Sequence, residues 1–207
     1  MTPTRTHRDP GSCAVVLFHS VLGVRPAVRD WAARLERAGY TVHVPDLFDG
    51  ATFDHYADGT RHVESIGGIP ELIARSQRAV ADLPPALVYA GFSAGAAAAE
   101  LLALTRPGAR GAILMHGVLP LEAFHSSEWP APVPVQLHQA VEDPFRSEPA
   151  IEAFTASVRR SHATLERWDY PGAGHLFADA ELPDYDATSA TQMLERVLDG
   201  LSRMCAA

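Results

Sequence analysis

Short apolar runs alternate with longer amphipathic runs along most of the chain. Residues 13–18 form a continuous apolar run, which is typical of a buried parallel strand. Further strand-like runs occur at 41–44, 86–90, 111–115, 133–138 and 163–168. Apolar residues at helical spacing predict helices at 26–38, 70–83, 96–104, 148–160 and 187–203. Residues 49–68 are rich in Gly, Asp and His, and they predict a long loop.

This alternation predicts an α/β fold, because strands joined through helices pair in parallel and the helices cover the sheet. We expect a mostly parallel sheet of about six or seven strands with helices on both faces. A chain of 207 residues fits one domain without a large cap. We expect a flexible N-terminal segment at 1–12, followed by a single domain at 13–204.

Net charge and cysteine content limit the binding partners and the cellular compartment that we expect. The net charge is −8 and there is no basic cluster, so we expect neither nucleic acid nor a membrane surface as a partner. No apolar run approaches membrane-spanning length, and Met1 to Pro10 is polar. Cys13 and Cys205 lie near opposite ends, and we expect two unpaired thiols in a cytoplasmic protein. The oligomeric state stays open between monomer and homodimer.

The most informative segment is Gly91-Phe92-Ser93-Ala94-Gly95. It follows a predicted strand and precedes an Ala-rich helix, which is the setting of a nucleophile elbow with Ser93 at its apex. Such a turn is tight, so glycines at both ends are required. A Gly/Ser turn without chemistry is the alternative interpretation. The elbow interpretation predicts a serine nucleophile at the carboxyl edge of the sheet.

A serine nucleophile needs a base and an acid that orients the base. In α/β-hydrolases these follow the serine in the order acid, then histidine, and the chain offers Asp143 and His175 after two later strands. Glu142 is the rival acid, and Asp143 before Pro144 also fits a plain turn. His175 follows a Gly-rich turn that lets it reach over the sheet edge. A surface histidine is the simpler alternative.

Two backbone N–H groups should stabilise the developing oxyanion. We assign them to Ala94, directly after the serine, and to Val21 in the loop after the first strand. A pocket for the substrate is expected around these groups, with the side chains of Ser20, Phe92, Tyr56 and His116 in contact with it. The sequence has no zinc-type histidine spacing and no nucleotide-binding fingerprint, so we expect no metal and no cofactor.

The chain resembles the dienelactone hydrolase family of α/β-hydrolases from about residue 13 to the last helix. The stretches that carry the resemblance are Leu17 to Val24, Ala38-Gly39-Tyr40 to Pro45-Asp46-Leu47, Gly91 to Gly95, Asp143, and Gly174-His175-Leu176-Phe177. The resemblance implies a minimal α/β-hydrolase that acts on esters or lactones without metal.

Three positions depart from the family pattern. Dienelactone hydrolases carry a cysteine at the elbow, where this chain has Ser93, and a glutamate in the first loop, where it has Ser20. The two changes are consistent, because a serine is activated by proton removal and not as a preformed anion. The arginine that binds the substrate carboxylate after the histidine is also missing, since Asp179 follows the His175 segment.

The sequence therefore predicts a serine hydrolase that cleaves a small carboxylic ester or a lactone through an acyl-enzyme. A thioesterase or acyltransferase would use the same three residues, and only the acyl carrier or acceptor would differ. A small-molecule-binding protein without catalysis is the alternative from another class.

Overall fold

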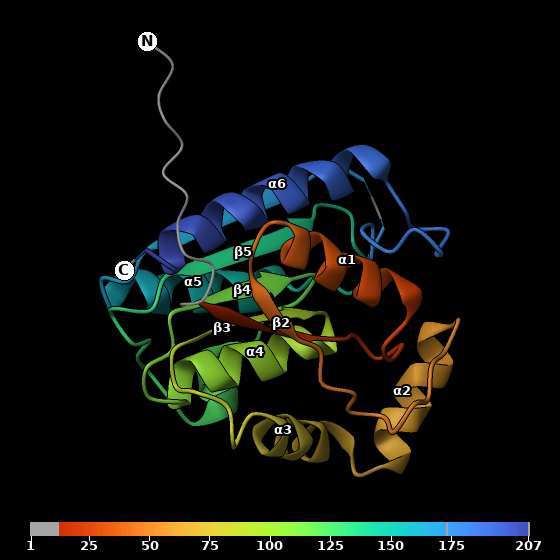
Figure 1. Cartoon of the computed structure of the whole chain (residues 1–207), viewed down its shortest axis with the longest axis horizontal. Helices are drawn as coiled ribbons and strands as arrows, with labels where there is room; N and C mark the ends of the chain where they lie inside the picture. The colour runs from red at the N-terminus through yellow and green to blue at the C-terminus, as the bar shows by residue number, and fades with distance from the viewer. Residues whose placement is uncertain (1–12, 173, 207) are drawn as a thin grey trace.

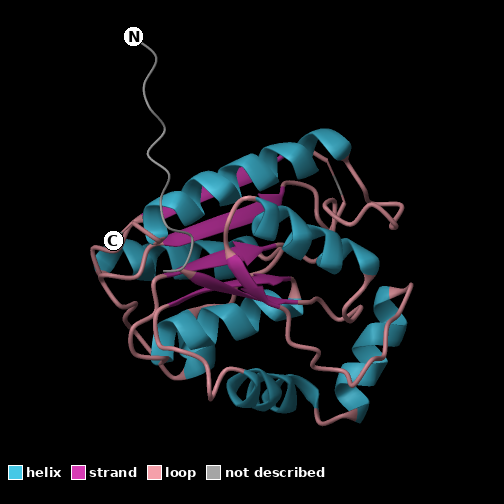
Figure 2. Cartoon of the chain, in the orientation of Figure 1, coloured by secondary structure: helices cyan, strands magenta, loops and turns pink. Residues whose placement is uncertain are grey.

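The computed structural model describes residues 13–172 and 174–206. Within them, one sheet of six parallel strands runs through the middle of the molecule in the order β2-β1-β3-β4-β5-β6 (Figures 1 and 2). The strands are β1 (Ala14–Phe18), β2 (Thr41–His43), β3 (Leu87–Phe92), β4 (Gly111–Met115), β5 (Val135–Ala140) and β6 (Leu165–Tyr170). The predicted α/β-hydrolase fold without a large cap is thus confirmed.

Helices cover both faces of this sheet, as predicted (Figure 1). The helices are α1 (Pro26–Arg37), α2 (Tyr56–Ser65), α3 (Gly68–Ala79), α4 (Ala94–Thr105), α5 (Glu148–Arg160) and α6 (Ala187–Met204), with a short 3-10 helix η2 (Leu121–Phe124). Helices α1 and α6 share one apolar cluster with the sheet, while α2 to α5 share the other. Two separate cores therefore lie on the two sides of the strands.

The residues of α1 and α4 explain how these two helices pack on the sheet. Helix α1 buries Val28, Trp31, Ala32 and Leu35, which recur at helical spacing and leave its other face to charged side chains. Helix α4 is buried over most of its circumference, and Ala-Ala-Ala-Ala at 96–99 keeps it thin enough to pack closely on the sheet. The helix that begins at the elbow is therefore fixed rigidly against β1, β3 and β4.

The segment at 49–68 differs from the prediction. Residues 56–65 form α2 instead of a long loop. The sequence concealed this helix because its only fully buried positions are Gly59 and Val63. The helix depends on tertiary contact instead, since a Cβ at Gly59 would lie 2.2 Å from the carbonyl oxygen of Val21. Helix α2 thus packs directly on the loop after β1.

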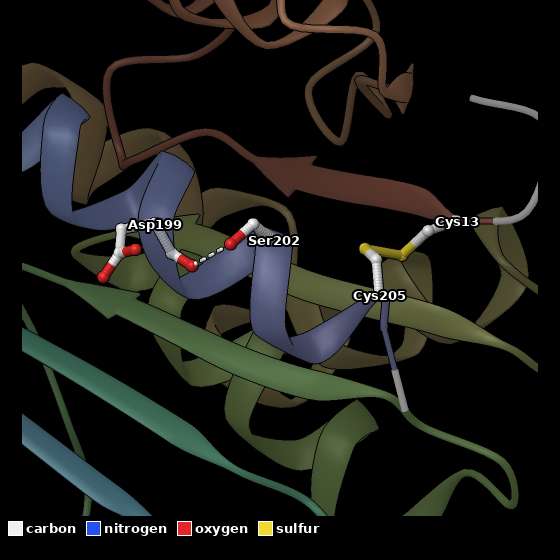
Figure 3. The surroundings of a disulfide bond; sticks show 4 residues. All are labelled: Cys13, Asp199, Ser202 and Cys205. Carbon is white, nitrogen blue, oxygen red and sulfur yellow. Dashed lines mark hydrogen bonds between the residues drawn. A yellow bond between two sulfur atoms is a disulfide. The ribbon is translucent and has the colours of Figure 1, made fainter. Parts of the chain in front are cut away.

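The expectation of two unpaired thiols is wrong. Cys13, just before β1, and Cys205, just after α6, form a disulfide across a separation of 192 residues (Figure 3). Sequence distance gave no indication that the start of β1 and the end of α6 lie side by side. The cross-link closes a loop of 192 residues, so it restricts the unfolded chain over most of its length.

One sequence prediction cannot be followed in the structure. The expected flexible segment at 1–12 lies outside the described residues. Among the residues that are described, no helix combines the length and the apolar character that a membrane span requires.

Candidate active site

Ser93 lies at the turn between β3 and α4, at the carboxyl edge of the sheet. Its backbone has φ 52° and ψ −114°, a conformation that residues other than glycine rarely adopt. The flanking glycines permit the turn. A Cβ at Gly91 would lie 2.1 Å from the carbonyl oxygen of Gly95, and a Cβ at Gly95 would lie 2.4 Å from that of His19. The local geometry is that of a nucleophile elbow.

His175 connects Ser93 to Asp143. Its Nε2 lies 2.8 Å from Ser93 Oγ, and its Nδ1 lies 2.6 Å from Asp143 Oδ2. Because a carboxylate only accepts hydrogen bonds, Nδ1 carries the proton and Nε2 offers its lone pair to the serine hydroxyl. His175 and Asp143 are both buried. Three residues that are far apart in the sequence thus form one continuous hydrogen-bonded row.

Asp143 is held by the turn after β5. Its Oδ1 accepts the backbone N–H of Phe145 at 2.7 Å, which leaves Oδ2 for His175. The rival acid Glu142 is an exposed neighbour in the same turn. Asp143, and not Glu142, is thus the carboxylate that accepts the hydrogen bond from His175 Nδ1.

The segment after His175 is anchored in the core. Leu176, Phe177 and Ala178 are buried in the apolar cluster under α1 and α6. Next to them, the buried guanidinium of Arg25 donates to Asp179 Oδ2 at 3.0 Å. The segment that follows the imidazole in the chain is therefore fixed in the core.

The loop after β1 lies beside the elbow. Ser20 Oγ accepts the N–H of Leu22 at 3.1 Å, and the N–H of Gly23 donates to the carbonyl of Ser20 at 3.2 Å. The N–H of Phe53 in turn donates to the carbonyl of Leu22 at 3.0 Å. Ala94 is the first residue of α4, where backbone N–H groups have no partner within the helix. Both predicted oxyanion donors, Val21 and Ala94, belong to segments next to Ser93.

Of the four side chains predicted to contact substrate, three are buried among protein groups. The Ser20 hydroxyl accepts a hydrogen bond from its own loop. Phe92 packs edge-on against Trp31, with 5.5 Å between ring centres. His116 packs against Phe92 and Phe177, and its buried ring nitrogens have no partner among the described residues. Burial, with the nearby His175 adding to it, lowers the pKa of His116 well below its usual range.

Tyr56 is the fourth, and it lies over the site. Its ring is 5.5 Å from the His175 ring, and its hydroxyl donates to Asp184 Oδ2 at 2.7 Å. Burial and this hydrogen bond raise the pKa of Tyr56, so the hydroxyl stays protonated. Tyr56 comes from the first turn of α2, the helix that the sequence did not reveal.

Phe145 was missed by sequence reasoning. Its ring lies 4.6 Å from His175 and 5.5 Å from Tyr56, yet 60% of the residue is exposed. An exposed aromatic ring against a buried imidazole marks the mouth of the site. Its place two residues after Asp143 was the available signal, because that turn had to approach the histidine.

Two further ionisable side chains, one in α4 and one in β5, are buried and form no hydrogen bond with the described Ser93. Burial raises the pKa of Glu100 in α4 well above its usual value, although the N–H of Leu119 donates to its Oε2 at 2.9 Å. Burial, with Arg196 adding to it, lowers the pKa of His138 in β5 to about 3. Across the described part of the chain, no group of three or more His, Cys, Asp or Glu side chains is arranged to hold a metal ion.

Comparison with known proteins finds relatives of similar sequence. A protein of Escherichia coli strain K12 named "Putative carboxymethylenebutenolidase" is 24% identical, over 89% of this chain and 74% of that protein.

Solved structures share the fold at lower identity. The dienelactone hydrolase-like promiscuous phosphotriesterase P91, from metagenomic libraries, is 22% identical with a TM-score of 0.79, over 97% of this chain and 89% of that one. Thermogutta terrifontis esterase 2, phosphonylated by cyclosarin, is 18% identical with a TM-score of 0.63, over 96% and 86%. The sequence matches the family described as "Dienelactone hydrolase family" over residues 2–205, and the chain therefore belongs to the dienelactone hydrolase family.

Proposed function

We propose that this protein is a serine hydrolase that cleaves a small carboxylic ester or a lactone through an acyl-enzyme. The observation that carries the proposal is the imidazole of His175, which lies within hydrogen-bond distance of both Ser93 Oγ and Asp143 Oδ2. Family membership supports the same class of reaction, since the E. coli relative is named for a lactone-opening enzyme.

The residues have separate roles in the proposed reaction. Ser93 Oγ attacks the carbonyl carbon while His175 Nε2 takes the hydroxyl proton. Asp143 keeps the imidazole in the tautomer with Nδ1 protonated and stabilises the imidazolium that forms. The N–H groups of Val21 and Ala94 stabilise the tetrahedral oxyanion, each worth roughly 3 kcal/mol of barrier.

Collapse of this intermediate breaks the bond to the leaving alcohol. The alcohol oxygen takes the proton from His175, and Ser93 is left acylated. Water then attacks the acyl-enzyme with His175 again acting as base, which releases the acid and restores the serine. With a lactone, the acid and the alcohol are two ends of one product.

The mouth of the site supports an uncharged or apolar substrate. Phe145 offers an exposed aromatic face beside His175, and Tyr56 contributes a half-buried one. Arg25, which lies closest in sequence to the loop after β1, is occupied by Asp179 and Asp54, with Glu181 at 3.4 Å. A carboxylate on the substrate would therefore find acidic groups around that cation.

Localisation stays a prediction. We expected a cytoplasmic protein with two unpaired thiols, but Cys13 and Cys205 form a disulfide, and such bonds persist mainly in oxidising compartments. Alkylation of free thiols at the moment of cell lysis, followed by intact mass, would measure the oxidised fraction. A fully alkylated protein would support the cytoplasm.

Turnover of a short p-nitrophenyl ester tests the proposal. Ser93→Ala removes the attacking oxygen, and we expect at most about 10⁻⁴ of the wild-type rate. Activity above a few per cent in this variant would remove Ser93 from the role of nucleophile. Adding competing alcohols to the wild-type reaction separates a hydrolase from an acyltransferase, because only the latter diverts the acyl group efficiently.

A further inference from the structure

One peptide of the loop after β1 is fixed by two hydrogen bonds to its carbonyl oxygen. It joins Ser20 to Val21, and its N–H is one of the two donors assigned to the oxyanion. Its carbonyl oxygen, on Ser20, accepts from the N–H of Gly23 at 3.2 Å and lies 2.7 Å from Nδ1 of His19. Two separate groups thus fix the side of the peptide that bears the carbonyl.

The hydrogen bonds of His19 define its tautomer. The backbone N–H of Leu47 donates to Nε2 at 3.0 Å, so this nitrogen carries no proton. Nδ1 therefore carries the proton and donates to the carbonyl of Ser20. Burial lowers the pKa of His19, against the opposing effects of that carbonyl and Asp46, which keeps the ring neutral.

The ring of His19 is itself fixed. It is 1% exposed and lies edge-on to Phe48 at 4.6 Å between ring centres. Leu47 and Phe48 belong to the segment after β2, where Asp46 accepts the N–H groups of Phe48 and Gly50 at 2.9 and 2.7 Å. The rigid turn after β2 therefore fixes His19, which follows the neighbouring strand β1.

We propose that His19 is a positioning residue that directs the N–H of Val21 into the oxyanion site. In a trans peptide the C=O and N–H bonds point in opposite directions, so a carbonyl held toward His19 turns the N–H away from it. A preorganised donor stabilises developing charge because it does not have to reorient during the reaction. The inference rests on the proposed function, since it assigns a role within the same site.

Two substitutions of His19 test the hydrogen bonds of its two ring nitrogens separately. In His19→Asn the side-chain amide nitrogen lies near the place of Nδ1 and can still donate to the carbonyl of Ser20. In His19→Gln the longer amide reaches the place of Nε2, so its oxygen can accept from Leu47 while the donor at Nδ1 is lost. Each variant loses one of the two hydrogen bonds, so their effects on stability are similar.

The experiment measures kcat and KM for a p-nitrophenyl ester and the affinity for phenylboronic acid, whose tetrahedral serine adduct needs the oxyanion donors. We expect His19→Gln to lose about 10²-fold in kcat, with KM changed less than about threefold and boronate affinity reduced in parallel. His19→Asn should lose about tenfold less than His19→Gln. His43→Gln, which makes the same change at the end of the edge strand β2, serves as control, and urea midpoints verify folding.

Each outcome bears on a different claim. Equal kcat losses in the two His19 variants, or losses that follow their urea midpoints, would overturn the positioning role while leaving the hydrolase intact. A wild-type protein that cleaves no ester and forms no boronate adduct would overturn the proposed function, and this inference with it.

Discussion

The floor of the candidate site and its mouth are built in different ways. The floor consists of Ser93, His175 and Asp143 with the Ser20–Val21 peptide, and its groups are held by short hydrogen bonds within buried surroundings. The mouth consists of Tyr56 and Phe145, whose rings contact His175 from more exposed positions. Under the proposed function, the floor carries out the chemistry and the mouth selects the substrate.

Breaking the floor should have the largest effect. Asp143→Asn keeps the shape of the side chain but offers an N–H where His175 needs an acceptor. The imidazole then loses the tautomer in which Nε2 can take the serine proton, and we expect kcat to fall by about 10³–10⁴. The matched control is Glu142→Gln on the exposed neighbour. A similar loss in both variants would mean that the turn, and not the carboxylate, supports the reaction.

Outside the floor and the mouth, the buried His138 of β5 gives the protein a pH-dependent stability. The folded state holds the pKa of His138 at about 3, below the unfolded value of 6.5. Its contribution is therefore fully present above pH 6.5 and is lost as the pH falls toward 3. By pH 5 we expect a loss of about 2 kcal/mol in the free energy of unfolding. Urea titrations at pH 7.5 and pH 5 measure it.

A variant separates His138 from other titrating groups. Glu100 acts in the opposite direction, because burial raises its pKa and the cost of burying it shrinks as the pH falls. His138→Gln should therefore show a smaller loss between pH 7.5 and pH 5 than the wild-type protein. Identical pH dependence in the two proteins would contradict a neutral buried His138.

Gly59 lies between the two regions and tests how strongly they are coupled. A Cβ there would lie 2.2 Å from the carbonyl oxygen of Val21, so Gly59→Ala has to displace either α2 or the loop after β1. We expect kcat to fall about tenfold although alanine favours the helix by about 1 kcal/mol. Thr60→Ala, on the exposed side of α2, is the control. Unchanged kcat in Gly59→Ala would show that the mouth can move without the floor.

The mouth alone should give the smallest effect, and in a different parameter. Phe145→Ala removes an exposed ring that contacts His175 but takes no part in the hydrogen bonds. We expect KM for a p-nitrophenyl ester to rise about three- to tenfold, while kcat and the KM of a methyl ester change little. Val141→Ala, exposed in the same turn, is the control. Equal changes for both esters would argue against recognition of the leaving group.

The sequence predicted the floor better than the mouth for a physical reason. The elbow needs glycines on both sides of Ser93, and successive parallel strands place Asp143 and His175 at the same edge of the sheet. These requirements leave a pattern that one sequence can show.

Long-range packing left no such pattern elsewhere. Helix α2 depends on contact between Gly59 and the loop after β1, and the disulfide depends on two chain ends meeting in space. His116 ends a strand, and the sequence did not reveal that its ring packs against Phe92 and Phe177. Contacts between residues that are distant in the chain determine all three features: α2, the disulfide and the packing of His116.

The central claim is that the Ser93 hydroxyl passes its proton to His175. Reaction with a fluorophosphonate, followed by intact mass and peptide mapping, tests this most directly. The account predicts one probe per chain on the peptide that bears Ser93, none on Ser93→Ala, and labelling at least about 10²-fold slower in His175→Ala. Equal labelling rates in wild type and His175→Ala, or a probe bound to another residue, would contradict it.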